Sequence, residues 1–511
     1  MHHALIFNTT TIWFQRPGGA HRIASFLREQ GWDVEVLDWA PYWTQEELRE
    51  WAQSKIKSNT VFCGFSCFFG HWSENMESFA QWIKDTYPNI KNIIGGSSKP
   101  RMESKATDYF VYGYGENAML AIIASLTGNT PGTGITFDPL YLGAGKKVIN
   151  ANDFYPAHPM RKAIIKYEDR DYIESHEWLT VEFSRGCMFE CLYCNFPVLG
   201  VKGDYTRDAD DYVAQLQDAY DRFGVTNYYA SDETFNDRSD KIKKFADATQ
   251  RLNFNPFISG FIRADLLVSR EQDWEQLSRL GFLGHFYGVE TFNHASAKAI
   301  GKGMHPQKLQ EGLLKAKEYF KTHDRKLYRG LIALIVGLPY ETKESMNAGA
   351  QWILDNWEGE AIDFTPLEIP IDEYSDKISK LGKNWKKWGY EEDTESILRF
   401  EKESVNVSHS IKNLQWKNEH MDLNWAKEFS ADFYKNKAWE KTWGTHNFML
   451  DWAAHQGITD IADIIGASHK RVNDNPSEFF WKRIKTYKAK KLGTTPDMLT
   501  DDFPKYQPWE F

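Results

Sequence analysis

The chain has little cysteine, no long apolar run and no excess of positive charge. Only five of its 511 residues are cysteine, too few for the disulfide framework of a secreted protein. Residues 1–7 lack the cationic segment and long apolar stretch of a secretory signal, and no stretch approaches the roughly 18 apolar residues of a membrane span. These absences predict a protein of the reducing cytoplasm without a membrane span, where thiolates can bind metal.

Charge and composition narrow the expected partners and the number of domains. The formal net charge of −10 disfavours a nucleic acid as substrate, because phosphate-binding surfaces are basic. A chain of 511 residues with 42% apolar content exceeds one hydrophobic core and predicts several domains. The expected substrate is a small molecule or a peptide, which no feature of the sequence identifies.

Strand and helix patterns alternate over the first 126 residues. Such alternation gives a parallel sheet covered by helices on both faces, so we expect a doubly wound α/β domain. The predicted strands are Ala4–Asn8, Asp33–Trp39, Val61–Cys67, Ile93–Ile94 and Tyr109–Tyr112. The predicted helices are Gly18–Gly31, Thr44–Ile56, Glu74–Tyr87 and a last one ending near Leu126.

A second alternating array begins at Leu179. Six strands separated by helices predict an open, partial (β/α)6 barrel, with reacting groups at the carboxyl ends of the strands. The predicted strands are Leu179–Phe183, Thr226–Ala230, Phe257–Ile262, His285–Val289, Tyr328–Val336 and Ile362–Ile369. The predicted helices are Asp208–Phe223, Asp240–Leu252, Gln272–Leu280, Pro306–Phe320 and Glu341–Trp357.

The remaining parts of the chain have weaker patterns. Residues 128–175 are rich in Gly, Pro and Asp and predict a connector on the surface. After residue 371 the strand pattern fades, and the many tryptophans there favour a packed, mostly helical, aromatic-rich domain over a disordered tail. The predicted domains are therefore 1–127, the connector 128–175, the barrel 176–370 and the C-terminal domain 371–511.

Three of the five cysteines stand together directly after the first strand of the second array. Cys187, Cys191 and Cys194 have the spacing C-x3-C-x2-C, and Tyr193 precedes the last of them. Three thiolates in one turn can hold three irons of a 4Fe-4S cubane and leave the fourth iron open for a ligand. A zinc site completed by His176 is the alternative, although zinc sites usually have a second cysteine pair. Cys63 and Cys67 are expected to be packing residues.

This cysteine spacing is the signature of the radical S-adenosylmethionine (SAM) superfamily, and the chain resembles that superfamily over residues 1–370. The resemblance implies a 4Fe-4S cluster on Cys187, Cys191 and Cys194 that cleaves SAM to a 5′-deoxyadenosyl radical. It also implies an electron donor such as flavodoxin or ferredoxin as partner. No catalytic side chain beyond the cofactor contacts is predicted.

Motifs after the later strands also resemble the superfamily and imply contacts with SAM. The acidic motif after the second strand offers Asp232 or Glu233 to the amino group of SAM; a helix N-cap is its alternative role. Arg263, in an R-x-D segment, could pair with the SAM carboxylate or with a neighbouring acid. Glu290, in a G-x-E-T segment continued by Ile300–Gly303, would meet the ribose hydroxyls. Gly337, in a G-x-P-x-E-T segment, would let the backbone approach the adenine.

The first domain resembles the cobalamin-binding domain of some radical SAM enzymes. In that architecture small residues at the carboxyl edge of the sheet make room for the nucleotide tail of cobalamin. The residues implied by the resemblance are Ser66, Gly95, Gly96, Ser97, Ser98, Gly113, Gly115 and Glu116. The D-x-H-x-x-G motif that supplies an axial histidine is missing, and the usual G-G-x-H-P segment is altered, so cobalamin is a possible second cofactor.

Three functions follow from the resemblance. The first is a radical SAM enzyme that uses cobalamin to methylate an unactivated carbon, or for a related radical rearrangement or cyclisation. The second is a cobalamin-free radical SAM enzyme whose first domain is a scaffold. The third is a non-catalytic iron-sulfur or zinc protein. Methylthiotransferases are disfavoured, because their first domain would bring three further cluster cysteines.

Overall fold

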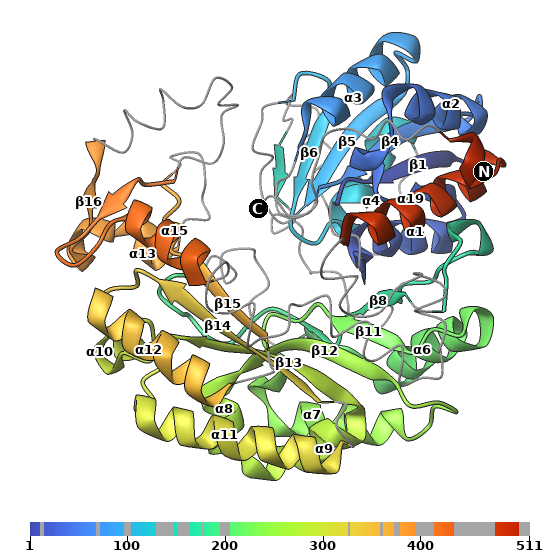
Figure 1. Ribbon diagram of the computed structural model, residues 1–511. Helices are drawn as coiled ribbons and strands as arrows, with labels where there is room; N and C mark the ends of the chain where they lie inside the picture. Colours follow the sequence, from blue (N-terminus) through green and yellow to red (C-terminus); the bar gives the residue numbers. More distant parts are fainter. Residues whose placement is uncertain are drawn as a thin grey trace. The chain divides into compact units, whose positions relative to one another are not determined.

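The computed structural model describes most of the chain as two compact units (Figure 1). Unit 1 comprises Met1–Val181, Ala214–Val225 and Thr459–Phe511, and unit 2 comprises Glu182–Val213 and Thr226–Ile458. None of the helices in the described part of the chain is both long and apolar enough to cross a membrane. The described residues are 1–10, 15–67, 72–96, 104–128, 148–150, 164–175, 177–194, 205–324, 328–357, 361–371, 379–394, 413–433 and 476–499.

A six-stranded parallel sheet forms the centre of unit 1, in the order β3-β1-β4-β5-β6-β7. Its register aligns Ser66 with Gly95 and Gly96 with Tyr112, which brings the carboxyl ends of neighbouring strands to one edge. All five predicted strands are present, and β7 is an additional strand inside the predicted connector. The strands are β1 (His3–Asn8), β3 (Asp33–Leu37), β4 (Thr60–Ser66), β5 (Lys91–Gly96), β6 (Tyr109–Tyr112) and β7 (Val148–Asn150).

Helices cover both faces of this sheet, because side chains along each strand alternate between two hydrophobic cores. In β1, Leu5 and Phe7 join the core that contains α2 (Gln45–Lys55), α3 (Glu74–Thr86) and α19 (Pro476–Leu492). Ala4 and Ile6 join the other core, with α1 (Gly18–Glu29) and α4 (Glu116–Thr127). The expected doubly wound domain is thus observed.

The C-terminal helix α19 belongs to unit 1. Ile484 and Tyr487 lie in the same core as Leu37 and Trp39, and the hydroxyl of Tyr487 accepts a 2.9 Å bond from the backbone N–H of Asp38. The structure therefore differs from the predicted boundaries, in which residues 371–511 form one C-terminal domain. Sequence patterns cannot show this packing, since the partners lie more than 400 residues apart in the chain.

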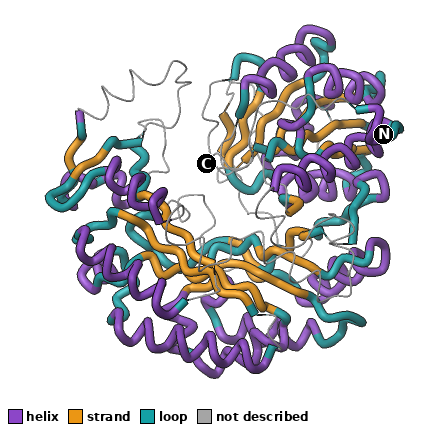
Figure 2. The backbone as a smooth tube through the Cα atoms, in the orientation of Figure 1, coloured by secondary structure: helices purple, strands orange, loops and turns teal. Residues whose placement is uncertain are grey.

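Unit 2 contains the parallel strands β11 to β15, hydrogen-bonded in chain order. Helices α7 to α12 lie along one face of these strands (Figures 1 and 2). Strand β8 (Trp178–Val181), the first strand predicted for the barrel, is also present and pairs in parallel with β2 (Gln15–Arg16) in unit 1. The expected open, partial barrel is therefore observed. The strands of unit 2 are β11 (Asn227–Ala230), β12 (Phe257–Arg263), β13 (Phe282–Glu290), β14 (Arg329–Val336) and β15 (Ala361–Pro366).

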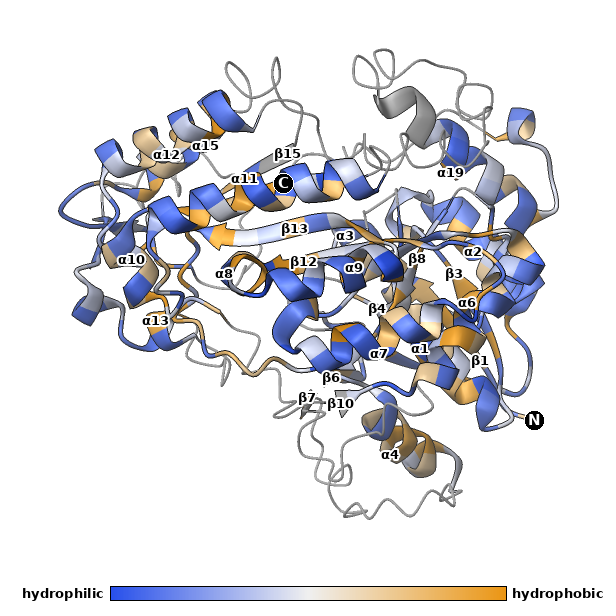
Figure 3. Ribbon diagram, turned by 90° about the horizontal axis from the view of Figure 1, so that it is seen from below, coloured by the Kyte–Doolittle hydropathy of each residue, from blue (hydrophilic) through white to orange (hydrophobic). Residues whose placement is uncertain are grey.

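Five helices of the barrel correspond to the predicted segments, whereas α8 (Ala264–Ser269) and α10 (His294–Ala299) were not predicted. In α11, Leu309, Leu313, Ala316 and Phe320 are buried at helical spacing, and Figure 3 shows hydrophilic and hydrophobic residues alternating along this helix. The helices are α6 (Ala209–Phe223), α7 (Ser239–Thr249), α8 (Ala264–Ser269), α9 (Trp274–Leu280), α10 (His294–Ala299), α11 (Pro306–His323) and α12 (Lys343–Asn356).

A short segment after the barrel packs onto its strand ends. Its described part, residues 379–394 and 413–433, contains helices α13 (Lys380–Lys383) and α15 (Leu423–Asp432) and a two-stranded antiparallel sheet. The backbone N–H of Leu414 donates to the carbonyl of Ile369 at 2.8 Å. The predicted helical domain is thus divided: this segment belongs to unit 2 and α19 to unit 1.

Candidate functional site

The three clustered cysteines lie on a loop after the short strand β9 (Ser184–Arg185) in unit 2. Each is partly exposed, and the N–H of Cys194 donates to the carbonyl of Cys191 at 3.1 Å. The N–H of Leu192 donates to Ile300 O at 3.2 Å, which ties the loop to the end of α10. The loop is therefore held by backbone bonds while its thiols remain accessible.

The donor set bears on whether the loop could hold a cluster or a single ion. In the described part of the chain, no group of three or more His, Cys, Asp or Glu side chains is placed to hold one metal ion. A zinc ion needs such a group around one point, whereas a cubane takes one thiolate at each of three separate iron corners. His176, the suggested fourth zinc ligand, lies outside the described residues.

Arg263 contacts the cysteine loop directly. Its guanidinium binds both carboxylate oxygens of Asp265, at 2.8 and 3.0 Å, and donates to Cys191 Sγ at 3.4 Å. Burial alone would lower the pKa of Arg263, but the bonds with Asp265 and Cys191 outweigh burial and raise it. Of the two expected partners, the structure shows the neighbouring acid, and it adds a cysteine that sequence reasoning did not foresee.

The structure separates the roles of the two acidic candidates after β11. Asp232 is 1% exposed and accepts bonds from Phe183 N at 2.9 Å and from Ser184 Oγ at 2.5 Å. Burial raises the pKa of Asp232 to about 6, against the opposing effects of Lys241 and these bonds. Glu233 is only half-buried, and after burial its charge contributes to a raised pKa of Cys187. Asp232 thus joins two strand ends, and Glu233 precedes Thr234, whose hydroxyl oxygen lies 3.7 Å from Cys187 Sγ.

Glu290 stands at an irregular strand end. The pairing of β13 with β14 shifts between Gly288 and Glu290, and Glu290 has a left-handed φ of 68°. Lys302 bonds to both the Gly288 carbonyl and the Glu290 carboxylate, the latter at 3.1 Å. Tyr193 hydrogen-bonds the same carboxylate. A Cβ on Gly288 would lie 2.8 Å from Glu290 Oε1, so a larger residue there would displace this carboxylate.

Two of the predicted motifs bind one another. The hydroxyl of Thr291, from the G-x-E-T segment, donates to the carboxylate of Glu341, from the G-x-P-x-E-T segment. Ser345 Oγ donates to the other oxygen of Glu341 at 2.7 Å, and Thr342 with Ser345 caps α12. These two segments thus have a structural role at the ends of β13 and β14, apart from any contact with SAM.

The space beside Gly337 is occupied by the segment after the barrel. Gly337 has a φ of +102°, and a Cβ there would overlap the Trp416 ring. The hydroxyl of Tyr390 donates to the Gly337 carbonyl at 2.6 Å. The close approach that requires glycine is that of Trp416, and the adenine contact at Gly337 stays a prediction.

The same segment also reaches the cysteine loop. The N–H of Leu381 donates to the Leu192 carbonyl at 2.9 Å, and Lys380 pairs with Glu190 at 2.5 Å. Sequence reasoning missed these residues and Trp416. The only available signal was the abundance of tryptophan after residue 371, which indicated a packed region and not its partners.

In unit 1, the carboxyl edge of the sheet carries small residues. Ser66 ends β4, and a Cβ on Gly19 of α1 would lie 3.2 Å from its hydroxyl. Among the described residues, the atom nearest a Cβ on Gly95 would be the Val111 carbonyl oxygen, at 4.0 Å. A Cβ on Gly96 would overlap the Cys67 carbonyl, so this glycine is needed by the fold. Small residues at Ser66 and Gly95 leave the cobalamin contact predicted for this edge as a prediction.

The other residues suggested for cobalamin differ in their surroundings. Gly113 has a φ of +80° directly after β6, and Gly115 precedes the first turn of α4. Glu116 is 1% exposed, and its carboxylate accepts a 3.0 Å bond from Arg22, so it serves an internal ion pair. Ser97 and Ser98 lie outside the described residues.

Cys63 and Cys67 are fully buried in unit 1, in the core with Phe65 and Phe79. Burial raises the pKa of Cys63 far above its ordinary value, so the thiol stays protonated and inert. The prediction that both cysteines are packing residues agrees with this burial.

Two family models match separate parts of the chain. Residues 181–353 match the radical SAM superfamily, and residues 15–123 match the B12 binding domain. A comparison with curated proteins found no match.

Solved structures of similar fold include two enzymes. The radical SAM methyltransferase TsrM from Kitasatospora setae, solved with tryptophan substrate and a SAM analogue, has a TM-score of 0.55 at 15% identity over 77% of this chain and 79% of that one. The cobalamin-dependent radical SAM enzyme OxsB, solved with aqua-cobalamin, has a TM-score of 0.56 at 14% identity over 96% of this chain and 72% of that one. At such identities the likeness concerns the fold.

Proposed function

We propose that the chain is a cobalamin-dependent radical SAM enzyme that methylates an unactivated carbon, on the basis of its matches to the radical SAM superfamily over residues 181–353 and to the B12 binding domain over residues 15–123. A 4Fe-4S cluster on Cys187, Cys191 and Cys194 would supply the electron that cleaves SAM to a 5′-deoxyadenosyl radical. The observation that carries the proposal is the loop itself, with three accessible thiols next to Glu233 and Glu290.

The side chains around the loop suit SAM. The Glu233 carboxylate can accept hydrogen bonds from a cationic amino group, and Asp232 is already bound by Phe183 and Ser184. The Glu290 carboxylate, held by Lys302 and Tyr193, is oriented to accept from a ribose diol. Of the two acidic candidates we therefore assign the amino group to Glu233. A low-potential donor such as flavodoxin or ferredoxin would deliver the electron.

Anaerobic reconstitution tests the cluster and the cleavage of SAM. The protein is loaded with iron and sulfide, and then given SAM and a strong reductant. Wild type should release 5′-deoxyadenosine, and C191A should release none, because the cluster loses a ligand. C63A, which removes a buried cysteine from unit 1, should behave as wild type. Equal product from wild type and C191A would reject the enzymatic function.

Cobalamin as second cofactor is supported by the small residues at the edge of the unit 1 sheet. Bound cobalamin would act as the methyl carrier between SAM and substrate. Among the described residues, no atom lies closer than 4.0 Å to a Cβ on Gly95, so G95V should add bulk at the edge without displacing this part of the backbone. We expect wild type to retain hydroxocobalamin after desalting and G95V to lose it, with equal thermal midpoints. Failure of the wild type to retain cobalamin would favour a cobalamin-free enzyme with unit 1 as a scaffold.

A further inference from the structure

Arg263 is held in one orientation at the end of β12. Its Nε and Nη2 donate to Asp265, and Nη2 also donates to the Gly301 carbonyl at 3.0 Å. The Phe189 ring lies 4.0 Å from the guanidinium carbon and covers one of its faces. These contacts fix a planar group whose remaining nitrogen, Nη1, points to the cysteine loop.

The backbone of Arg263 is fixed as well. Its N–H donates to Asn236 Oδ1 at 2.8 Å, and Asn236 Nδ2 donates back to the Arg263 carbonyl at 3.0 Å. Asn236 is 2% exposed and Arg263 is 7% exposed, so water competes little for these bonds. Both ends of the residue are therefore placed before any ligand binds.

We propose that Arg263 is a positioning residue that donates a charge-assisted hydrogen bond to the Cys191 thiolate and so raises the reduction potential of the cluster. The contact that carries this is Nη1 to Cys191 Sγ, at 3.4 Å. The inference rests on the proposed function, because it requires the cluster on these cysteines. The partner of Arg263 is then Cys191, a cluster ligand, and not the SAM carboxylate.

The physical reason is the negative charge that reduction adds to the cluster. A guanidinium next to one thiolate stabilises the reduced state more than the oxidised state, and hydrogen bonds to ligand sulfurs are known determinants of cluster potential. Asp265 offsets part of the positive charge but also aims the guanidinium. Reduction itself transfers one electron from the donor to the cluster, with no bond made or broken.

The test is a redox titration of the reconstituted protein, with Ti(III) citrate as reductant and electron paramagnetic resonance of the reduced cluster as readout. R263Q removes the charge and R263K keeps it with a less directional donor. R251Q is the matched control, because Arg251 is an exposed arginine of unit 2 that pairs with Asp210 at 2.7 Å. Iron and sulfide content are measured for each protein, and far-ultraviolet circular dichroism checks the fold.

We expect the midpoint potential of R263Q to be more negative than that of wild type, with R263K between them and R251Q unchanged. A loaded R263Q with the wild-type potential and spectrum would overturn the inference. Loss of iron from both R263Q and R263K in a folded protein would also overturn it, since Arg263 would then serve to hold the loop. A wild-type protein that binds no cluster would instead reject the proposed function.

Discussion

At the scale of single residues, the charged groups of the site are held by partners on neighbouring strand ends. Glu290 has a left-handed backbone conformation next to a shift in strand register. Its carboxylate is bound by Lys302 and Tyr193. Such an arrangement is costly for a non-glycine residue and is typical of positions that serve a ligand. Small changes beside Glu290 should therefore affect binding more than folding.

Gly288 offers a direct test of this expectation. In G288A the new Cβ would lie 2.8 Å from Glu290 Oε1 and 3.2 Å from Lys302 Nζ, so the pair must move. We expect SAM to bind about tenfold or more weakly, which corresponds to about 1.4 kcal/mol, as measured by calorimetry on the reconstituted protein. G349A is the control, because its Cβ would make an ordinary 3.4 Å contact with Phe292. Equal affinities for both variants would contradict the role of Glu290.

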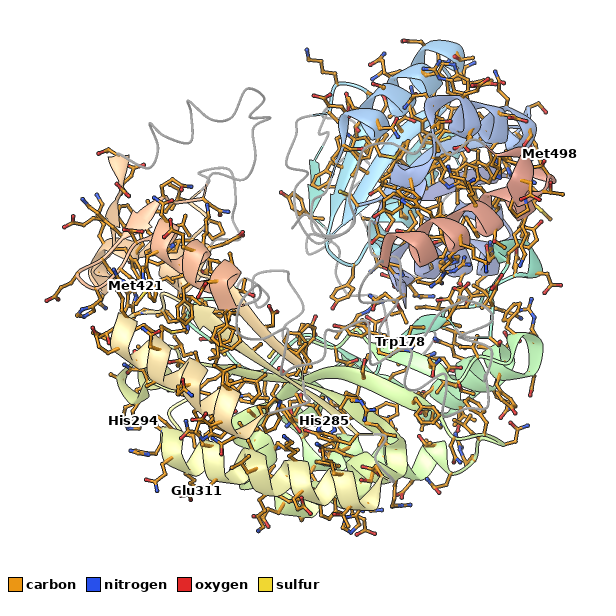
Figure 4. All side chains as sticks on the ribbon, in the orientation of Figure 1. Trp178, His285, His294, Glu311, Met421 and Met498 are labelled. Carbon is orange, nitrogen blue, oxygen red and sulfur yellow. The ribbon has the colours of Figure 1, made fainter. Side chains whose placement is uncertain are left out.

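His285 is a buried residue whose ionisation should affect stability. Figure 4 marks it in unit 2, where its Nε2–H donates to the Phe282 carbonyl at 2.8 Å and Nδ1 accepts from the Tyr287 hydroxyl at 2.7 Å. Burial lowers its pKa from 6.5 to about 4. As pH falls from 6.5 towards 4, His285 binds a proton in the unfolded chain but stays neutral in the folded unit. The folded state therefore loses stability relative to the unfolded state.

The expected loss is about 3 kcal/mol over this interval. Thermal midpoints of wild type and H285F are compared between pH 4 and pH 7. The difference between them should change with pH, because H285F lacks the titrating group. H323Q removes an exposed histidine at the end of α11 and should follow the wild-type profile. A wild-type profile for H285F as well would show that His285 titrates alike in the folded and unfolded states.

At the scale of elements, the segment after the barrel is joined to the strand ends by aromatic side chains. Trp416 lies against Gly337 and donates from Nε1 to the Leu367 carbonyl at 2.8 Å, and Tyr390 binds the Gly337 carbonyl. Leu381 and Lys380 connect the same segment to the cysteine loop. One element thus supports both the end of β14 and the loop.

Substitution of Gly337 should detach this segment. In G337A the Cβ would overlap the Trp416 ring, and overpacking of this kind costs about 1–3 kcal/mol in addition to the strain of a positive φ. G389A is the matched control, since Gly389 has a φ of +81° with nothing within 4 Å of its Cβ. We expect faster limited proteolysis of residues 379–433 in G337A than in G389A. Equal rates would show that the contact with Trp416 is unimportant.

At the scale of the whole molecule, both ends of the described chain belong to unit 1. Helix α19 adds Ile484 and Tyr487 to the core around Leu37 and Trp39. Lys491 donates to the Val36 carbonyl at 2.7 Å, and Arg16 lies between the rings of Trp39 and Tyr487. The stability of unit 1 should therefore depend on a helix that follows the barrel in the sequence.

The variant I484A tests this dependence. Ile484 is fully buried, and truncation of such a side chain to alanine costs about 2–5 kcal/mol. We expect faster amide hydrogen exchange in β3 (Asp33–Leu37), measured by mass spectrometry. K482A removes an exposed side chain of the same helix and should leave β3 protected. Unchanged exchange in I484A would mean that α19 does not support unit 1.

Most strands and helices could be predicted from the sequence, because local periodicity specifies them. Apolar residues in β1 alternate between two cores, and those of α11 recur at helical spacing, so the sequence pattern shows which faces are buried. The three-cysteine loop was also predictable, since its ligands lie within eight residues of one another. Glu290 and the pair Asp232 and Glu233 could be picked out from their positions at strand ends, without a choice between the two acids.

The sequence by itself determined the two α/β regions and the cysteine loop, because periodicity and short spacing are local properties. Only the tertiary structure decided that Asp232 binds strand ends while Glu233 lies by the loop, and that Arg263 faces Cys191. Only it showed that Trp416 fills the space at Gly337 and that α19 joins unit 1. These contacts join residues far apart in the chain, and side-chain packing in three dimensions selects among partners that the sequence leaves equivalent.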